Sequence, residues 1–321
     1  KDVSRRLKII PARFVVEETH VHKYACKHCQ EQDITTPVKE AQAEPPVIKG
    51  SIATPEAIAH IMTSKYVMYS PLYRQEQEYQ RAGVPLSRQT MSNWLLKAAT
   101  DWLQPVYERM KAELLKQDIL HADETTLQVL HEPGKKAQSK SYIWLYRTGR
   151  DAPQQLVLYE YQDSRRAAHP EDFLDGFKGY LHADGYAAYY KIPGIKVAAC
   201  WAHVRRKYEE ALQGTAKSEV AKLTNIQTGK QYCDRLFAIE SEINDLPPDE
   251  RLQKRKEVVE PLLKEFHDWL FRVNDGPKSL LGKAAHYNRK QWQWLTTYLE
   301  DGRLEISNNR AERSIKPFVM G

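Results

Sequence analysis

The spacing of apolar residues divides most of this chain of 321 residues into three successive stretches. Across residues 54–116, apolar side chains recur at helical spacing, which predicts helices. Across residues 118–200, short runs of β-branched and aromatic residues are separated by polar turns, which predicts strands. Residues 204–300 return to a charged helical pattern, which Pro247-Pro248 and Gly276-Pro277 interrupt.

The strand-rich segment predicts a mixed sheet. Its apolar runs cover residues 119–129, 141–146, 155–161, 179–184 and 195–200, and short helices are predicted at 170–177 and 187–190. Short polar loops join the first three runs, so we expect an antiparallel meander. The order β-β-β-α-β-α-β followed by helices is that of the ribonuclease-H-like fold. The predicted fold class is therefore α/β (mixed α+β), a ribonuclease-H-like mixed sheet with flanking helices and a large helical insertion.

Two aspartates lie in or beside predicted core strands. Asp123 and Asp184 each end a His-Ala-Asp tripeptide, at residues 121–123 and 182–184. A carboxylate in a core strand is costly unless it is paired or bound to a cation. Two such strands could bring both carboxylates to one hard metal ion. The alternative for either Asp alone is that it caps a turn or the next helix.

The last segment predicts a helix that starts at Ser307 or Asn308, since either is a good N-cap. Such a helix would turn Glu312 back toward the sheet. Asn309, Arg313 and Lys316 would lie near the same edge. Glu305 is a rival acid, but it precedes the expected N-cap, so helix placement favours Glu312.

The helical segment before the sheet contains a pattern typical of a helix-turn-helix. A turn with Gly83 and Pro85 is followed by Ser87, a good N-cap for the next helix. The polar residues expected to face DNA on that helix are Arg88, Gln89 and Asn93. A plain helical connector remains the alternative interpretation.

Cys26 and Cys29 form a Cys-x-x-Cys, which is half of a common structural zinc site. His20 and His22 could complete it, or the missing ligands could lie upstream. Without such partners the two cysteines would be an ordinary reduced pair. We expect a zinc-ribbon-like piece.

Composition narrows the class of protein. Hydrophobic residues make up 41% and charged residues 28%, which fits a globular protein. The net charge of +6 permits a polyanionic partner. No apolar run approaches the roughly 18 residues of a membrane span, and four cysteines in no disulfide framework favour a reducing cytoplasm. The chain has no initial Met and stops abruptly, so both ends are expected to be cuts in a longer protein.

Together these patterns divide the chain into four regions. We expect a truncated zinc-binding region, a helix-turn-helix-like DNA-binding region, a catalytic core in two pieces and a helical insertion between those pieces. The boundaries are 1–40, 41–116, 117–203 with 303–321, and 204–302, respectively.

Six segments together resemble the insertion-sequence-66 family of bacterial transposases. They are Tyr24–Cys29, Lys65-Tyr66 with Pro71–Gln75, Asp123–Thr125, Asp184–Tyr186, Cys200–Arg206 and Asn308–Arg313. The resemblance implies a DDE transposase in which Asp123, Asp184 and Glu312 are the acidic triad. It also implies metal-dependent cleavage of double-stranded DNA at element ends and strand transfer into target DNA.

The implied chemistry would use two Mg²⁺ or Mn²⁺ ions on the three acids. His203, Arg205 and Arg206 follow the fifth strand and could hold a phosphate; a solvated helix start is the alternative for these three. On the last helix, Asn309, Arg313 and Lys316 are further expected DNA contacts. A homo-oligomer and small accessory proteins are further expectations by analogy. The competing interpretations are an inactive or repurposed DNA-binding protein and a ribonuclease-H-like nuclease that cuts without joining.

Overall fold

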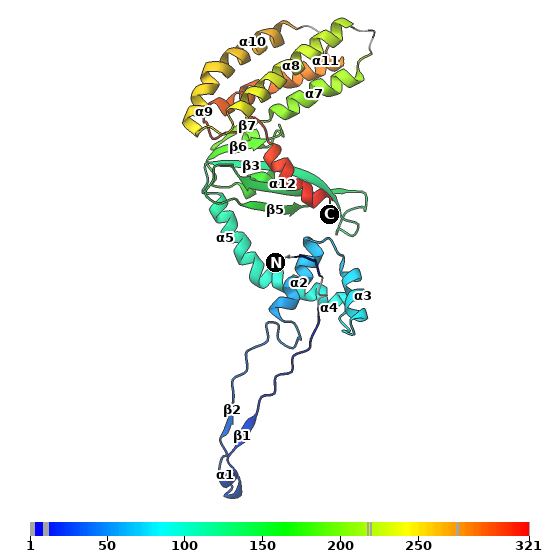
Figure 1. The fold of residues 1–321 in the computed structure, drawn as a ribbon, viewed down its shortest axis with the longest axis vertical. Coiled ribbons are helices and arrows are strands. Elements are labelled where there is room, and N and C mark those ends of the chain that lie inside the picture. The colour runs from blue at the N-terminus through cyan, green and yellow to red at the C-terminus, as the bar shows by residue number, and fades with distance from the viewer. Residues whose placement is uncertain (1–3, 9–12, 217, 219, 274–275, 321) are drawn as a thin grey trace. The chain divides into compact units, whose positions relative to one another are not determined.

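The computed structural model describes residues 4–8, 13–216, 218, 220–273 and 276–320 (Figure 1). The chain forms two compact units, residues 1–105 and 106–321. The first unit carries the Cys-x-x-Cys and a group of helices. The second unit carries the sheet and the remaining helices, and it holds the acidic residues Asp123, Asp184 and Glu312.

The first unit opens with a small hairpin around the cysteine pair. Strand β1 (Lys23–Ala25) pairs antiparallel with β2 (Val38–Glu40), and the short helix α1 (Lys27–Glu31) lies between them in sequence. These residues are almost entirely exposed, so the hairpin has little apolar core of its own. A small piece of this kind usually needs a bound metal to hold its shape.

Three helices with a shared core make up the rest of this unit. They are α2 (Pro55–Tyr66), α3 (Leu72–Arg81) and α4 (Arg88–Ala98). The hydroxyls of Thr54 and Ser87 accept hydrogen bonds from the first turns of α2 and α4, which confirms the N-cap predicted at Ser87. Ile61, Met91 and Trp94 are buried between the helices. A π-helical turn (Ala99–Leu103) and α5 (Gln104–Leu114) follow in sequence.

The second unit is built on a five-stranded mixed sheet in the order β5-β4-β3-β6-β7. The strands are β3 (Ile119–Gln128), β4 (Lys140–Thr148), β5 (Val157–Gln162), β6 (Gly179–Ala183) and β7 (Ile195–Ala199). The first three pair antiparallel, which confirms the predicted meander, while β3, β6 and β7 are parallel. The predicted helices between them are shorter than expected: α6 is Ala168–Phe173, and Tyr189–Lys191 is a 3₁₀ turn.

Helices that follow the sheet in sequence pack side by side as a bundle (Figure 1). They are α7 (Trp201–Gly214), α8 (Val220–Glu242), α9 (Pro248–Lys254), α10 (Glu260–Arg272) and α11 (Leu280–Leu295), with a π turn at Arg255–Val259 and a 3₁₀ turn at Thr297–Leu299. Arg255 is almost fully buried and pairs with Glu240 at 2.7 Å, while donating to the carbonyl of Leu304. A buried charge needs such partners. The pair therefore ties the bundle to the segment that leads into the last helix.

The last helix, α12 (Asn309–Met320), packs against the sheet. Ala311 and Ile315 are buried against Leu145 of β4, and Val157 of β5 packs on the same small cluster. These apolar contacts fix one face of α12 on the sheet. The opposite, polar face carries Arg313 and Lys316, which are exposed.

Candidate functional site

The strand register brings Asp123 and Asp184 to the same edge of the sheet. His121 of β3 lies opposite His182 of β6 in a parallel pair. Each aspartate comes two residues after its histidine, so the two carboxylates leave neighbouring strands at matching positions. Gly185 has φ +100°, a conformation that suits glycine and lets the chain turn directly after Asp184.

The carboxylate of Asp123 is largely buried and lies near three other acids, which makes its ionised form unfavourable. Burial raises its pKa to about 7, and the negative charges of Asp184, Glu124 and Glu312 add to this effect. One backbone N–H, that of Glu124, donates to Asp123 Oδ1 at 2.9 Å and opposes the shift. A group of acids that repel one another in this way is the setting in which a bound cation is stabilising.

Glu312 approaches this edge from the first turn of α12. Its Oε1 lies 3.8 Å from Nε2 of His203, and its Oε2 lies 3.5 Å from the guanidinium of Arg206. Oε1 is buried and has no hydrogen-bond donor among the described residues. Glu312 therefore contributes charge to Asp123 while its carboxylate faces α7.

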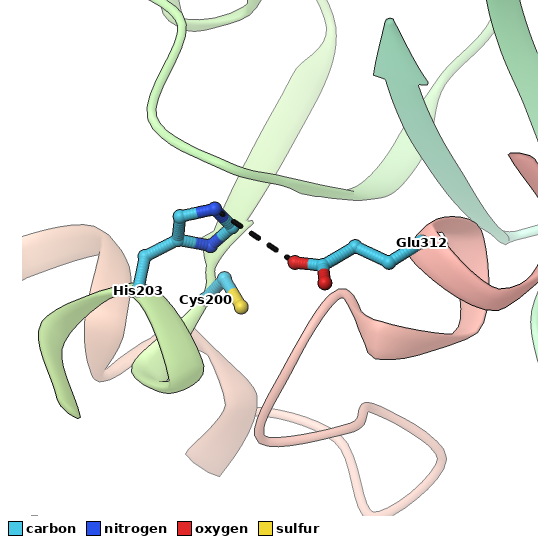
Figure 2. A group of neighbouring side chains, drawn as sticks. All are labelled: Cys200, His203 and Glu312. Carbon is cyan, nitrogen blue, oxygen red and sulfur yellow. Dashed lines mark ion pairs between the residues drawn. The ribbon is translucent and has the colours of Figure 1, made fainter. Parts of the chain in front are cut away.

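Cys200 and His203 come from the junction of β7 and α7 and face Glu312 (Figure 2). Within the described part of the chain, these three residues form the only group of three metal-ligating side chains whose donor atoms all lie within 4.8 Å of one another. The three predicted acids do not form such a group, and neither do Cys26 and Cys29 with His20 or His22. Burial raises the pKa of Cys200 to about 11, against hydrogen bonds from nearby backbone N–H groups.

A buried asparagine, Asn308, joins the start of α12 to the sheet, although its sequence position predicted only a helix cap. Its Nδ2 group donates to the carbonyl of Ala122 at 2.8 Å, and its Oδ1 lies 3.0 Å from Nδ1 of His121. The backbone N–H of Asn308 donates to Sγ of Cys200 at 3.2 Å. Asn308 is fully buried, so these bonds hold the helix start against β3 and β7 at once.

The two histidines of the repeated His-Ala-Asp lie beneath the aspartates. The rings of His121 and His182 stack with centroids 4.3 Å apart, and both side chains are fully buried. Burial and the neighbouring His121 hold the pKa of His182 well below its usual range, so its ring is neutral. The repeated tripeptide was a signal for these histidines too, but it had led us to expect site residues only at its aspartates.

Glu305 contacts the two buried histidines, His121 and His182, that lie beneath the aspartates. Its carboxylate receives two hydrogen bonds from Arg310, at 2.7 and 3.0 Å, and lies 3.0 Å from Nε2 of His121. Burial alone would raise the pKa of Glu305, but His121 and Arg310 hold it far below its usual range. Glu305 is thus a paired structural carboxylate, unlike Glu312.

Glu124, the neighbour of Asp123, is also held by specific partners. Its side chain is 2% exposed and accepts from Arg165 Nε at 2.8 Å and from the Tyr189 hydroxyl at 3.0 Å. Burial and the charge of Asp184 raise its pKa, although Arg165 opposes this. The side chain of Arg165 is 42% exposed, so it places a positive charge at the border of the acidic group.

A cleft of about 620 Å³ opens beside Glu312. It is lined by Ala202, Arg205, Arg206, Glu209, Phe237, Asn309, Glu312, Arg313 and Lys316. Five of these residues were predicted from the sequence to contact DNA, and the structure brings them together. Arg205 is partly neutralised there by Asp234, whose Oδ1 lies 2.5 Å from Nε. Ala202, Glu209 and Phe237 carry no pattern that would have marked them.

The predicted candidates of the first unit lie on two elements. Arg88, Gln89 and Asn93 are exposed on α4, and Gln89 donates to Asn93 at 3.0 Å. Cys26 and Cys29 have free thiols at the start of α1, and hydrogen bonds from Cys29 lower the pKa of Cys26. The side-chain hydrogen bond with Cys26 raises the pKa of Cys29, so only Cys26 is shifted toward the thiolate that zinc binds.

In the part of the chain that the structure describes, no helix combines the length and the apolar character that crossing a membrane requires.

Comparison with known proteins assigns the family. Residues 50–321 match the family described as "Transposase IS66 family", and residues 1–30 match the "zinc-finger binding domain of transposase IS66". An uncharacterized protein of Sinorhizobium fredii (strain NBRC 101917 / NGR234), y4jD, is 31% identical over 99% of this chain and 62% of its own length. Another from the same organism, y4hP, is 32% identical over 100% of this chain and 60% of its own length. The chain thus spans about three fifths of the length of these relatives, and it belongs to the IS66 family of transposases.

Proposed function

We propose that this chain is the catalytic part of a DDE transposase, an enzyme that cuts DNA at the ends of an insertion sequence and joins those ends to target DNA. Asp123, Asp184 and Glu312 are its acids. The observation that carries the proposal is the register of β3 and β6, which sets Asp123 beside Asp184. Burial, together with the charges of Asp184 and the other acids, raises the pKa of Asp123 to about 7, which supports it. The five-stranded mixed sheet, with its antiparallel meander followed by two parallel strands, supports the proposed ribonuclease-H-like core.

The three acids fit divalent metal ions of the Mg²⁺ or Mn²⁺ type. Carboxylate oxygens are the ligands that such hard cations prefer. The charges of Asp184 and Glu312 also raise the pKa of Asp123, and a bound cation would offset that repulsion. Two bound ions would activate the attacking water or 3′-hydroxyl and stabilise the leaving oxygen. Glu312 lies on the border of this group, and rotation of its side chain from His203 toward Asp123 would complete the set.

The protein's own residues bind and orient the DNA. Arg206, Arg313 and Lys316 line the cleft beside Glu312, where their charges would hold phosphates next to the bond to be cut. Asn309 lines the same cleft, and His203 lies beside Glu312. Both would fix the position of the DNA strand. Phosphoryl transfer depends mainly on such positioning and on charge stabilisation, so these residues would act beside the metal ions by holding the DNA in place.

The first unit would supply recognition of the element ends. Arg88, Gln89 and Asn93 are exposed on the second helix of the α3–α4 pair, where a helix-turn-helix carries its base contacts. The match of residues 1–30 to a zinc-finger domain supports zinc on Cys26 and Cys29, completed by further ligands. Assembly into a homo-oligomer on paired ends, with accessory proteins of the element, is part of the proposal.

The test is a cleavage and joining assay on duplex DNA that carries an element end. With Mn²⁺ or Mg²⁺ the chain should release a 3′-hydroxyl at the end and transfer it to target DNA. Asp123→Ala should abolish both products while DNA binding persists, and Asp175→Ala, an exposed aspartate before β6, is the matched control. Cleavage by Asp123→Ala would refute the acid assignment. If the unmodified chain cleaves but does not join, the protein is a nuclease and not a transposase.

A further inference from the structure

Cys200, His203 and Glu312 form a compact group in which Cys200 has no part in the proposed DNA chemistry. Cys200 is the N-cap of α7 and His203 comes three residues later, so both side chains face the same side of the helix start. Glu312 reaches them from α12 (Figure 2). One donor atom from each, a sulfur, an imidazole nitrogen and a carboxylate oxygen, all lie within 4.8 Å of one another.

Two atoms of this group are buried without a hydrogen-bond partner among the described residues. They are Nδ1 of His203 and Oε1 of Glu312. Buried polar atoms are nearly always paired, because an unpaired one loses its hydrogen bonds to water without replacing them. A cation bound between the three side chains would give lone pairs on these residues a partner. At Cys200, the N–H of Asn308 points at the sulfur, 3.2 Å away, and would stabilise the thiolate once a cation is bound.

We propose that this group is a binding site for a thiophilic divalent cation such as Zn²⁺, held by Sγ of Cys200, the imidazole of His203 and the carboxylate of Glu312. Sulfur and imidazole ligands select zinc-like ions over Mg²⁺, which prefers oxygen alone. Binding converts the Cys200 thiol to a thiolate, and its proton leaves to solvent. Glu312 also lines the open cleft, which gives the ion a path from solvent and a place for a water as fourth ligand.

A cation at this site would also affect the proposed catalytic acids, and this effect rests on the proposed function. Glu312 would be shared between two kinds of ion. A zinc-like cation on Cys200 and His203 would hold the Glu312 carboxylate facing α7, away from Asp123 and Asp184. The cleavage site would then lack its third acid, so a soft cation would act as an inhibitor that Mg²⁺ does not mimic.

The test is a Co²⁺ titration of the full chain, because a cobalt–thiolate bond gives a charge-transfer absorption band. Cys26→Ser and Cys29→Ser are introduced first, so that the cysteine pair of the first unit is silent. We expect a band that saturates at one equivalent of Co²⁺ in this background. The band should disappear with Cys200→Ser and persist with Cys233→Ser, which changes the other buried cysteine, on α8. No band in the background, or a band that survives Cys200→Ser, would overturn the site.

A second variant keeps the test valid if Cys200→Ser does not fold. Glu312→Gln changes a half-buried side chain and removes only a charged ligand oxygen. It should weaken Co²⁺ binding about tenfold or more, since even changes to residues that merely orient metal ligands cost about 10- to 100-fold. Unchanged affinity would rule out Glu312 as a ligand. Neither titration measures DNA cleavage, so failure of the proposed function would leave both results interpretable.

Discussion

The side chain of Asn308 donates a hydrogen bond to the carbonyl of Ala122, the residue directly before Asp123, with a donor–acceptor distance of 2.8 Å. This bond joins two segments that are 186 residues apart in the chain. It places the first turn of α12, and with it Glu312, at a fixed height along β3. This buried amide thus helps to set the position of Glu312 relative to Asp123.

Asn308→Ala should therefore make the position of Glu312 relative to Asp123 less fixed, and it should also lower the stability of the fold. Loss of the buried hydrogen bonds to Ala122 and His121 should lower the free energy of unfolding by about 1–3 kcal/mol. In a domain of this size that corresponds to about 2–4 °C in melting temperature for each kcal/mol. Calorimetry measures this, and Asn309→Ala, the half-buried neighbour, is the control. Equal melting temperatures for the two variants would contradict the role given to Asn308.

The raised pKa of Asp123 predicts an unusual pH dependence of stability. The folded pKa of about 7 lies above the unfolded value, so the folded state binds the proton more tightly. This group therefore costs no stability near pH 4 but becomes increasingly destabilising as the pH rises toward about 7. Asp123→Asn removes the charge and should melt at a higher temperature than the original chain at about pH 8 without metal. The difference should shrink toward about pH 4, and a constant difference would contradict the shift.

The two glutamates near α12 should respond in opposite ways to the same substitution. Glu305→Gln breaks the ion pair with Arg310 and the contact with His121, so it should lower the melting temperature clearly. Glu312→Gln removes one weak contact each to His203 and Arg206, so the melting temperature should change little while cleavage is lost. Thermal unfolding and the cleavage assay on both variants separate the roles. A stable, inactive Glu305→Gln beside an active Glu312→Gln would reverse the assignment.

The exposed face of α4 should determine affinity for element ends. Arg88→Ala should weaken binding and reduce the slope of log K against log salt by about 0.9 if Arg88 contacts a phosphate. Arg81→Ala removes the same charge from the last turn of α3 and is the control. Binding titrations at several salt concentrations measure both slopes. Equal affinities and equal slopes for the two variants would contradict the placement of Arg88 at the DNA.

The sheet and its two aspartates could be predicted because their signals are local. Short apolar runs predict strands of this length. The repeated His-Ala-Asp marked equivalent positions on two of these strands. The helix that carries Glu312 could be placed from its capping residues in the same way. The short helices were less predictable: residues 174–177 continue the helical pattern of α6, but the helix ends at Phe173.

The layer beneath the acids could not be predicted from the sequence. The contacts of His121 with Asn308 and Glu305 are made by side chains far apart in the chain, and no local spacing encodes them. The same holds for the ion pair of Glu124 with Arg165, since each residue alone has the appearance of an ordinary surface charge. Such partners are selected by tertiary packing, which decides which polar groups become buried together.

The most direct test of the proposed acid site is the position of Mn²⁺ in crystals of the chain, located by the anomalous scattering of manganese. We predict Mn²⁺ between the carboxylates of Asp123 and Asp184, with Glu312 turned toward it. Mn²⁺ absent from both aspartates at millimolar concentration and with an element-end DNA bound would contradict the assignment of these residues as the catalytic acids.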